Sequence, residues 1–160
     1  QKKQGLLARW SDSLEGGTIS RGREIFFGRS AVACRRCHTV KGTGGRVGPD
    51  LSKIGLEKKR PYLLESIVLP NKQIAKGFET TVVATEAGKV HVGIVRADDG
   101  KTLTLVTADG KTVRVPKDEI DEQTRGKSAM PEDAIKHLSA TDVRDLVAYL
   151  ASLKQAPAKK

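Results

Sequence analysis

The stretch "FETTVVATEAGKVHVGIVRADDGKTLTLVTADGKTVRVP", residues 78–116, decides what kind of fold this 160-residue chain can adopt. Val, Thr, Ile and Leu stand in short alternating runs, which is the pattern of half-buried strands. The runs are separated by "EAG" (86–88), "DDG" (98–100) and "ADG" (108–110). Because Asp-Gly-type turns join antiparallel strands, we predict an all-β segment over 74–124, with about four strands in a meander.

Helical patterns stand on both sides of this segment. The spacing of apolar residues predicts helices over 18–28, 61–69 and 139–154. In the last of these, Ser139 is a suitable N-cap, and Asp142 three residues later completes a variant of the capping box. The sequence therefore predicts a small helical domain that is interrupted by a β insertion.

Charge and composition restrict the classes of partner. Residues 1–60 carry 14 Lys and Arg against 5 Asp and Glu, which accounts for most of the net charge of +10. This excess favours an acidic protein partner, and no nucleic-acid motif or cluster of stacking aromatic residues accompanies it. No stretch approaches the roughly 18 consecutive apolar residues of a transmembrane segment. Only six residues are aromatic, so a large bound cofactor would help to fill the interior.

The stretch "ACRRCHTV", residues 33–40, contains both cysteines of the chain. A C-x-x-C pair is typical of a dithiol oxidoreductase, of half a zinc site or, with His next, of covalent haem attachment. Zinc needs about four ligands, and a thioredoxin-like pair belongs in a βαβ unit, which is not predicted here. Haem attachment accounts for both cysteines and the histidine. Cys34 and Cys37 would form thioethers to a haem c, and His38 would be an axial ligand of the iron. A dithiol oxidoreductase without haem is the alternative.

A second axial ligand is needed for a low-spin haem, and Met or His usually supplies it. Met130, in "GKSAMPED" (126–133), is the only methionine, and Pro131 stiffens the loop after it. His91 and His137 are the competitors. With His38 and Met130 both bound to the iron, we expect an electron carrier and no enzymatic activity. The alternative is a haem c enzyme, or a gas or peroxide sensor, in which Met130 dissociates.

These pieces resemble the cytochrome c family: "CRRCH", "GGRVGPDL" (44–51), a Met-Pro loop, and a C-terminal helix with a tyrosine. More narrowly, residues 60–83, the strand segment and "SAMP" (128–131) are similar to the haem-binding cytochrome c domain of planctomycetes and verrucomicrobia. The resemblance implies a mainly α, class I cytochrome c-like helical fold. In it, a small antiparallel β-sheet of about four strands is inserted between the proximal-His and axial-Met segments.

The resemblance also implies roles for particular residues. The carbonyl of Pro49 would accept a hydrogen bond from the second ring nitrogen of His38, as an outer partner that fixes the imidazole. Gly22, Phe26 and Tyr149 would form the contact between the two terminal helices. Independently of the resemblance, we consider Arg46 and Arg60 as candidates to pair with haem propionates, or as residues that are simply exposed.

The same resemblance guides the expected domain organisation and cellular location. We interpret 1–15 as a linker or the end of a preceding domain, 16–154 as the cytochrome c domain, and 155–160 as a flexible basic tail. Members of the resembled family are often modules of large secreted proteins, so an upstream dehydrogenase domain is the expected electron donor and an acidic protein the acceptor. Thioether formation takes place outside the bacterial inner membrane, which predicts a periplasmic or secreted protein.

Overall fold

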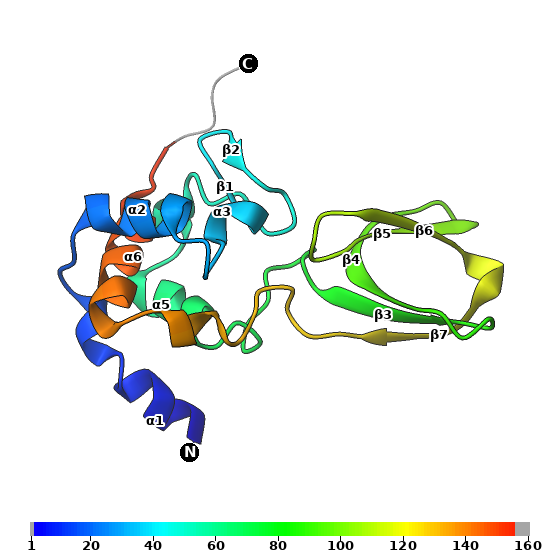
Figure 1. The fold of residues 1–160 in the computed structure, drawn as a ribbon, viewed down its shortest axis with the longest axis horizontal. Coiled ribbons are helices and arrows are strands. Elements are labelled where there is room, and N and C mark those ends of the chain that lie inside the picture. Colours follow the sequence, from blue (N-terminus) through cyan, green and yellow to red (C-terminus); the bar gives the residue numbers. More distant parts are fainter. Residues whose placement is uncertain (1, 156–160) are drawn as a thin grey trace.

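The protein consists of a helical part and an antiparallel sheet that lies beside it (Figure 1). The structure is a computed structural model and describes residues 2–155. The helical part contains α1 (Lys2–Ala8), η1 (Ser11–Leu14), α2 (Ile19–Gly28), α3 (Cys34–Cys37), α4 (Ile54–Glu57), α5 (Arg60–Val68), η3 (Ala134–His137), α6 (Ala140–Ser152) and a short hairpin, β1 (Thr39–Val40) and β2 (Thr43–Gly44). The sheet contains β3 (Thr80–Thr85), β4 (Val90–Asp98), β5 (Thr102–Val106), β6 (Thr112–Pro116) and β7 (Ile120–Arg125), with η2 (Lys117–Glu119) before the last strand.

The prediction of a mainly α, class I cytochrome c-like fold was wrong. The described chain combines α and β structure: it has three helices of nine or more residues, α2, α5 and α6, and a five-stranded antiparallel sheet in place of about four strands. The sheet encloses its own buried cluster of Val83, Leu103, Leu105 and Val115, separate from the cluster of the helices. Since it buries a core of its own, it is a second structural unit.

The strands follow the alternation of the sequence, and their order in the sheet is β6-β5-β4-β3-β7. Gly88, Gly100 and Gly110 all have φ between +80° and +85°, and they occupy the three turns at which the Gly residues predicted a reversal of the chain. Glycine adopts this left-handed conformation without steric cost, so these turns set the register of the strands between them.

Strand β7 was not predicted as a strand. Its sequence, "IDEQTR", lacks alternating apolar residues, and all of its residues after Ile120 are exposed. It pairs with β3 at the edge of the sheet, where backbone hydrogen bonds hold it without burial of its side chains. Polar edge strands give no hydrophobic period, which explains why the sequence pattern predicted about four strands where the sheet has five.

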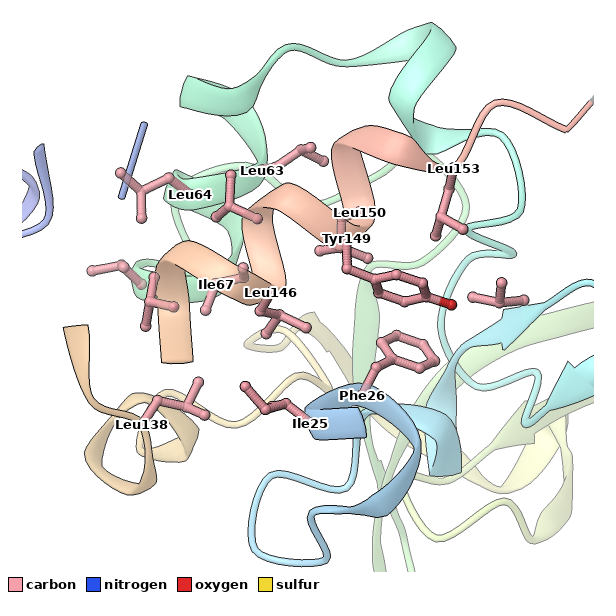
Figure 2. Packing of buried hydrophobic residues seen from close by; sticks show 14 residues of the cluster. Ile25, Phe26, Leu63, Leu64, Ile67, Leu138, Leu146, Tyr149, Leu150 and Leu153 are labelled. Atoms are coloured by element: carbon pink, nitrogen blue, oxygen red, sulfur yellow. The ribbon is translucent and has the colours of Figure 1, made fainter. Parts of the chain in front are cut away.

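The core of the helical part forms where α2 and α5 pack against α6. Figure 2 shows side chains from α2 and α5 converging on those of α6. Among them, the rings of Phe26 and Tyr149 lie with their centroids 5.8 Å apart and tilted by 57°, a favourable aromatic geometry. The apolar stripe predicted for the C-terminal helix is buried, and it consists of Val143, Leu146, Val147, Leu150 and Leu153.

The close approach of α2 to α6 depends on Gly22. A Cβ atom built on Gly22 would overlap the carbonyl oxygen of Asp145 and would lie 2.6 Å from the Cβ of Tyr149. Asp145 itself is buried, and its Oδ1 accepts a hydrogen bond of 2.7 Å from the backbone N–H of Thr18, just before α2. The two helices are therefore joined by close backbone contact at Gly22 and by a buried carboxylate at the start of α2.

The predicted start of α6 is confirmed. Ser139 is the N-cap residue, its Oγ accepts from the N–H of Asp142, and the Asp142 carboxylate accepts from the N–H of Ser139. Arg29 donates to the same carboxylate at 2.5 Å. These hydrogen bonds hold the pKa of Asp142 below its usual value, chiefly through Arg29, so the carboxylate is charged at neutral pH.

Residues 2–14, which we interpreted as a linker or the end of a preceding domain, form α1 and η1. Leu6, Leu7, Trp10 and Leu14 pack against the core of the helical part. The predicted basic tail over 155–160 lies, apart from Gln155, outside the described residues. Within residues 2–155, no helix has the length and apolar character needed to cross a membrane.

The substitution Gly22→Ala tests the contact between α2 and α6. We expect it to lower the free energy of unfolding by about 1–3 kcal/mol, because the added methyl group overlaps backbone that cannot move away freely. The matched control is Gly28→Ala in the same helix, where a Cβ would meet no atom within 4 Å. Unfolding in urea measures both variants, and equal stability of the two would contradict the close contact.

Candidate haem-attachment site

Cys34 and Cys37 begin and end the single turn of α3, directly before His38. The turn is closed by a hydrogen bond of 3.0 Å from the N–H of His38 to the carbonyl of Cys34. Ala33, the residue before the turn, has φ 50° and ψ 34°, a left-handed conformation that is uncommon for a residue with a side chain. The backbone thus places the two thiols one turn apart and leads into His38 in an extended conformation.

The imidazole of His38 is held by the segment that contains Gly48 and Pro49. Its Nδ1 lies 2.8 Å from the carbonyl oxygen of Pro49. Because a carbonyl can only accept, Nδ1 carries the proton, and the lone pair of the imidazole is on Nε2. This is the contact that the resemblance implied, and it leaves Nε2 as the nitrogen able to bind a metal ion.

Gly48 packs flat against the same ring. A Cβ on this residue would lie 2.6 Å from Cε1 and 2.8 Å from Nδ1 of His38, so no larger residue fits without displacing the ring. Sequence reasoning missed Gly48, although its place directly before Pro49 was a usable signal. The imidazole is therefore fixed by a hydrogen bond at its edge and by backbone against its face.

Burial lowers the pKa of His38 below 6.5, and the hydrogen bond to Pro49 acts in the opposite direction. At neutral pH the imidazole is therefore uncharged, which is the state that a metal ligand requires. A histidine that served as a surface cation would need the opposite environment. The electrostatics and the hydrogen bond together favour ligation through Nε2.

The loop that holds His38 is itself attached to α3 and to the sheet. The N–H groups of Gly45 and Gly48 donate to the carbonyls of Arg35 and Cys37, at 2.9 and 2.7 Å. From β4, the guanidinium of Arg96 donates to the carbonyl of Arg46 at 2.5 Å and also lies over the ring of Phe78. The sheet therefore supports the loop around His38, a connection that the sequence pattern did not indicate.

Met130 lies on a different loop, between β7 and η3. Its backbone N–H donates to Oγ of Ser128 at 3.2 Å, and its side chain is partly buried. Residues on both sides of it are bound to Asn71: the N–H of Ser128 donates to Oδ1 of Asn71 at 2.7 Å, and Nδ2 of Asn71 donates to Glu132 at 2.5 Å. Met130 thus stands in a loop with fixed ends, and no sequence motif had drawn attention to Asn71.

The other predicted residues lie as follows. His91 stands opposite Val83 in the sheet, and His137 is exposed in η3. The guanidinium of Arg60 donates to the carbonyl of Gly16 at 2.8 Å, while Arg46 is exposed and contributes its carbonyl to Arg96. The structure therefore brings together Cys34, Cys37, His38 and Pro49, and it gives Arg60 a partner within the protein.

The thiols are in an environment that opposes ionisation. Burial raises the pKa of Cys34 to about 11 and also raises the pKa of Cys37. Reactive C-x-x-C pairs show the reverse, because a thiolate is the attacking species. In the described residues 2–155, no three His, Cys, Asp or Glu side chains gather into a group that could hold a metal ion. The raised pKa values of the thiols thus do not favour a dithiol oxidoreductase.

A cleft of about 640 Å³ lies next to α3. Phe27 and Arg29 line it from the end of α2, Arg35 and Arg36 from α3, and Gly45 from the loop after it. Arg35 and Arg36 are exposed, so this side of the motif presents positive charge to the solvent. Cys34, Cys37 and His38 are not among the residues that line this cleft.

The residues present fit a covalently attached haem. Two protonated thiols lie one helical turn apart, and a neutral imidazole that follows them has Nε2 available and Nδ1 bound to a carbonyl. Because Gly48 has no side chain, its backbone can lie against the imidazole of His38, where a Cβ atom would overlap the ring. Thioether bonds to the haem would come from Cys34 and Cys37, and axial ligation from His38.

Comparison with known proteins adds no identification, since no protein-family model matches the chain and a search of curated proteins found no significant match.

The substitution Gly48→Ala tests the packing of the loop against His38. We expect it to lower the free energy of unfolding by about 1–3 kcal/mol, because either the imidazole or the loop must move. Pro49→Ala is the comparison, since it keeps the carbonyl that binds Nδ1. Urea unfolding followed by Trp10 fluorescence is the measurement. If Gly48→Ala is as stable as the unsubstituted protein, the loop does not hold the ring.

Proposed function

We propose that this protein carries one covalent haem c on Cys34 and Cys37, with His38 and Met130 as the axial ligands, and transfers single electrons. The observation that carries the proposal is the arrangement around His38: a neutral, partly buried imidazole, fixed through Nδ1 by Pro49 and packed against Gly48. The motifs that resemble the haem-binding cytochrome c domain support the same function, although they do not define the fold.

The bound haem would supply an iron that alternates between ferric and ferrous states. The protein residues do the rest. The Pro49 carbonyl fixes the orientation of His38 and increases the basicity of Nε2. The two thiols, protonated and half-buried, provide covalent attachment points at fixed spacing on α3. Met130, on the loop between β7 and η3, is the candidate for the opposite side, and a thioether ligand favours the ferrous state.

The proposed role in electron transfer follows from the number of protein ligands on the haem iron. With an imidazole and a thioether both bound, no coordination position is open to oxygen or peroxide, so the protein passes electrons and carries out no bond chemistry. We also propose that it works in the periplasm or as part of a secreted protein, because thioether attachment is made there. An upstream dehydrogenase domain is the proposed donor.

The proposed acceptor is an acidic redox protein that docks beside α3. Arg35 and Arg36 are exposed on the turn that carries the thiols, and Arg29 lies at the edge of the same cleft. Arg23 extends this basic surface and lies over the ring of Phe27, 5.1 Å from its centroid. Positive charge this close to the attachment site would orient an acidic partner toward the haem and increase the association rate.

The substitution Met130→Ala tests the axial ligand. We expect the absorption band of a methionine–iron bond to disappear from the oxidised protein, and the reduced protein to bind carbon monoxide far more tightly at neutral pH than it does with Met130 in place. The control is Met130→His, which supplies a second imidazole: it should not bind carbon monoxide, and its potential should be lower. Unchanged spectra in Met130→Ala would contradict the assignment of Met130.

Charge reversal at Arg35 and Arg36 tests the docking surface. For Arg35→Glu/Arg36→Glu we expect the rate constant of electron transfer with an acidic redox protein to fall about tenfold or more at low ionic strength, and less at high salt. Reduction by a neutral hydroquinone should be unaffected. The control is Lys89→Glu/Lys111→Glu, which makes the same change in net charge at two exposed lysines in turns of the sheet. An equal loss in both variants would mean that only net charge matters.

A further inference from the structure

Asn71 lies in the segment between α5 and β3, directly after the buried Pro70 and far from Met130 in the sequence. Its position is set by the end of α5. The N–H of Lys72 donates to the carbonyl of Leu69 at 2.9 Å, and the ammonium group of Lys72 lies 2.5 Å from the carboxylate of Glu65. The side chain of Asn71 therefore starts from a turn with a fixed backbone.

Both ends of the Asn71 amide are used, one on each side of Met130. Oδ1 accepts the N–H of Ser128 at 2.7 Å, and Nδ2 donates to Oε1 of Glu132 at 2.5 Å. The distance along the chain from Ser128 to Glu132 is four residues, with Met130 at the centre. An amide side chain can accept at its oxygen and donate at its nitrogen, which is the combination used here.

The same loop is tied down at its beginning by the sheet. The N–H of Gly126 donates to the carbonyl of Thr80 at 2.9 Å, and the hydroxyl of Thr80 donates to the carbonyl of Lys127. These contacts end before Ser128. From Ser128 to Glu132, the side-chain hydrogen bonds to a distant part of the described chain come from Asn71. Met130 bonds within the loop, to Ser128, and Glu132 also pairs with the nearby Lys127 at 3.7 Å.

We propose that Asn71 is a positioning residue for Met130: its amide joins Ser128 to Glu132 and so fixes the loop that presents the thioether. The inference rests on the proposed function, since it concerns how the second axial ligand is held. Asn71 does not touch the haem iron; it acts through the loop. Without it, the loop keeps its anchor at Thr80 but loses its attachment on both sides of the ligand.

The substitution Asn71→Asp is the most specific test. An aspartate can still accept from the N–H of Ser128, but its second oxygen then faces the carboxylate of Glu132, and the two negative charges repel each other. Glu132→Gln alone leaves Asn71 a carbonyl oxygen to donate to. In the double variant Asn71→Asp/Glu132→Gln, the glutamine amide can donate to the aspartate, which restores the bridge in reverse. Gln73→Ala, an exposed amide in the same segment, is the control.

The measurement is carbon monoxide binding to the reduced, haem-loaded protein at neutral pH, together with the methionine–iron band of the oxidised protein. For Asn71→Asp we expect carbon monoxide to bind about tenfold more tightly than to the unsubstituted protein, because the loop releases Met130 more easily. Glu132→Gln and Gln73→Ala should behave like the unsubstituted protein, and the double variant should recover most of the difference.

Urea unfolding of the same proteins separates positioning from general stability. If Asn71→Asp lowers the free energy of unfolding but leaves carbon monoxide binding and the band unchanged, Asn71 has only a structural role and the inference is overturned. It is overturned equally if the double variant folds but shows no recovery. Met130→Ala distinguishes a failure of the proposed function from a failure of this inference. If Met130→Ala changes neither the spectrum nor carbon monoxide binding, Met130 is not the ligand. If Met130→Ala changes them and Asn71→Asp does not, only the role of Asn71 is wrong.

Discussion

The packing of α6 against α2 is the contact on which the helical part depends. The two helices come from opposite ends of the described chain, and the whole sheet lies between them in sequence (Figure 1). Gly22 allows the backbones to touch, Asp145 binds the start of α2, and α5 closes the core from the other side. The segment that carries His38 follows α2, and the loop of Met130 leads through η3 into α6, so this contact bears on both.

The proposed site draws on two loops that are held in different ways. The loop of His38 is folded back on α3 by its own backbone hydrogen bonds and is supported from the sheet by Arg96. The loop of Met130 enters from the sheet edge and is held by Thr80 and Asn71. The sheet therefore contacts both loops, which gives it a role in holding the site as well as a core of its own.

Much of the local structure could be predicted from the sequence, because it depends on neighbouring residues. Ser139 and Asp142 indicated the start of α6, and the glycines of the three turns indicated where the strands reverse. The fold class was wrong because the number of strands and the separate core of the sheet depend on pairing between distant segments, and β7 has a polar sequence. The contacts of Gly48, Arg96 and Asn71 likewise join residues whose relation no local pattern shows.

The covalent attachment of one haem is the central claim, because every role given to His38, Met130 and Asn71 depends on it. The direct test is the intact mass of the protein after production in the periplasm of a bacterium that has haem-attachment machinery, followed by alkylation under reducing conditions. We expect a mass increased by one haem and no alkylation at Cys34 or Cys37. The mass of the polypeptide alone, with both cysteines alkylated, would contradict the claim.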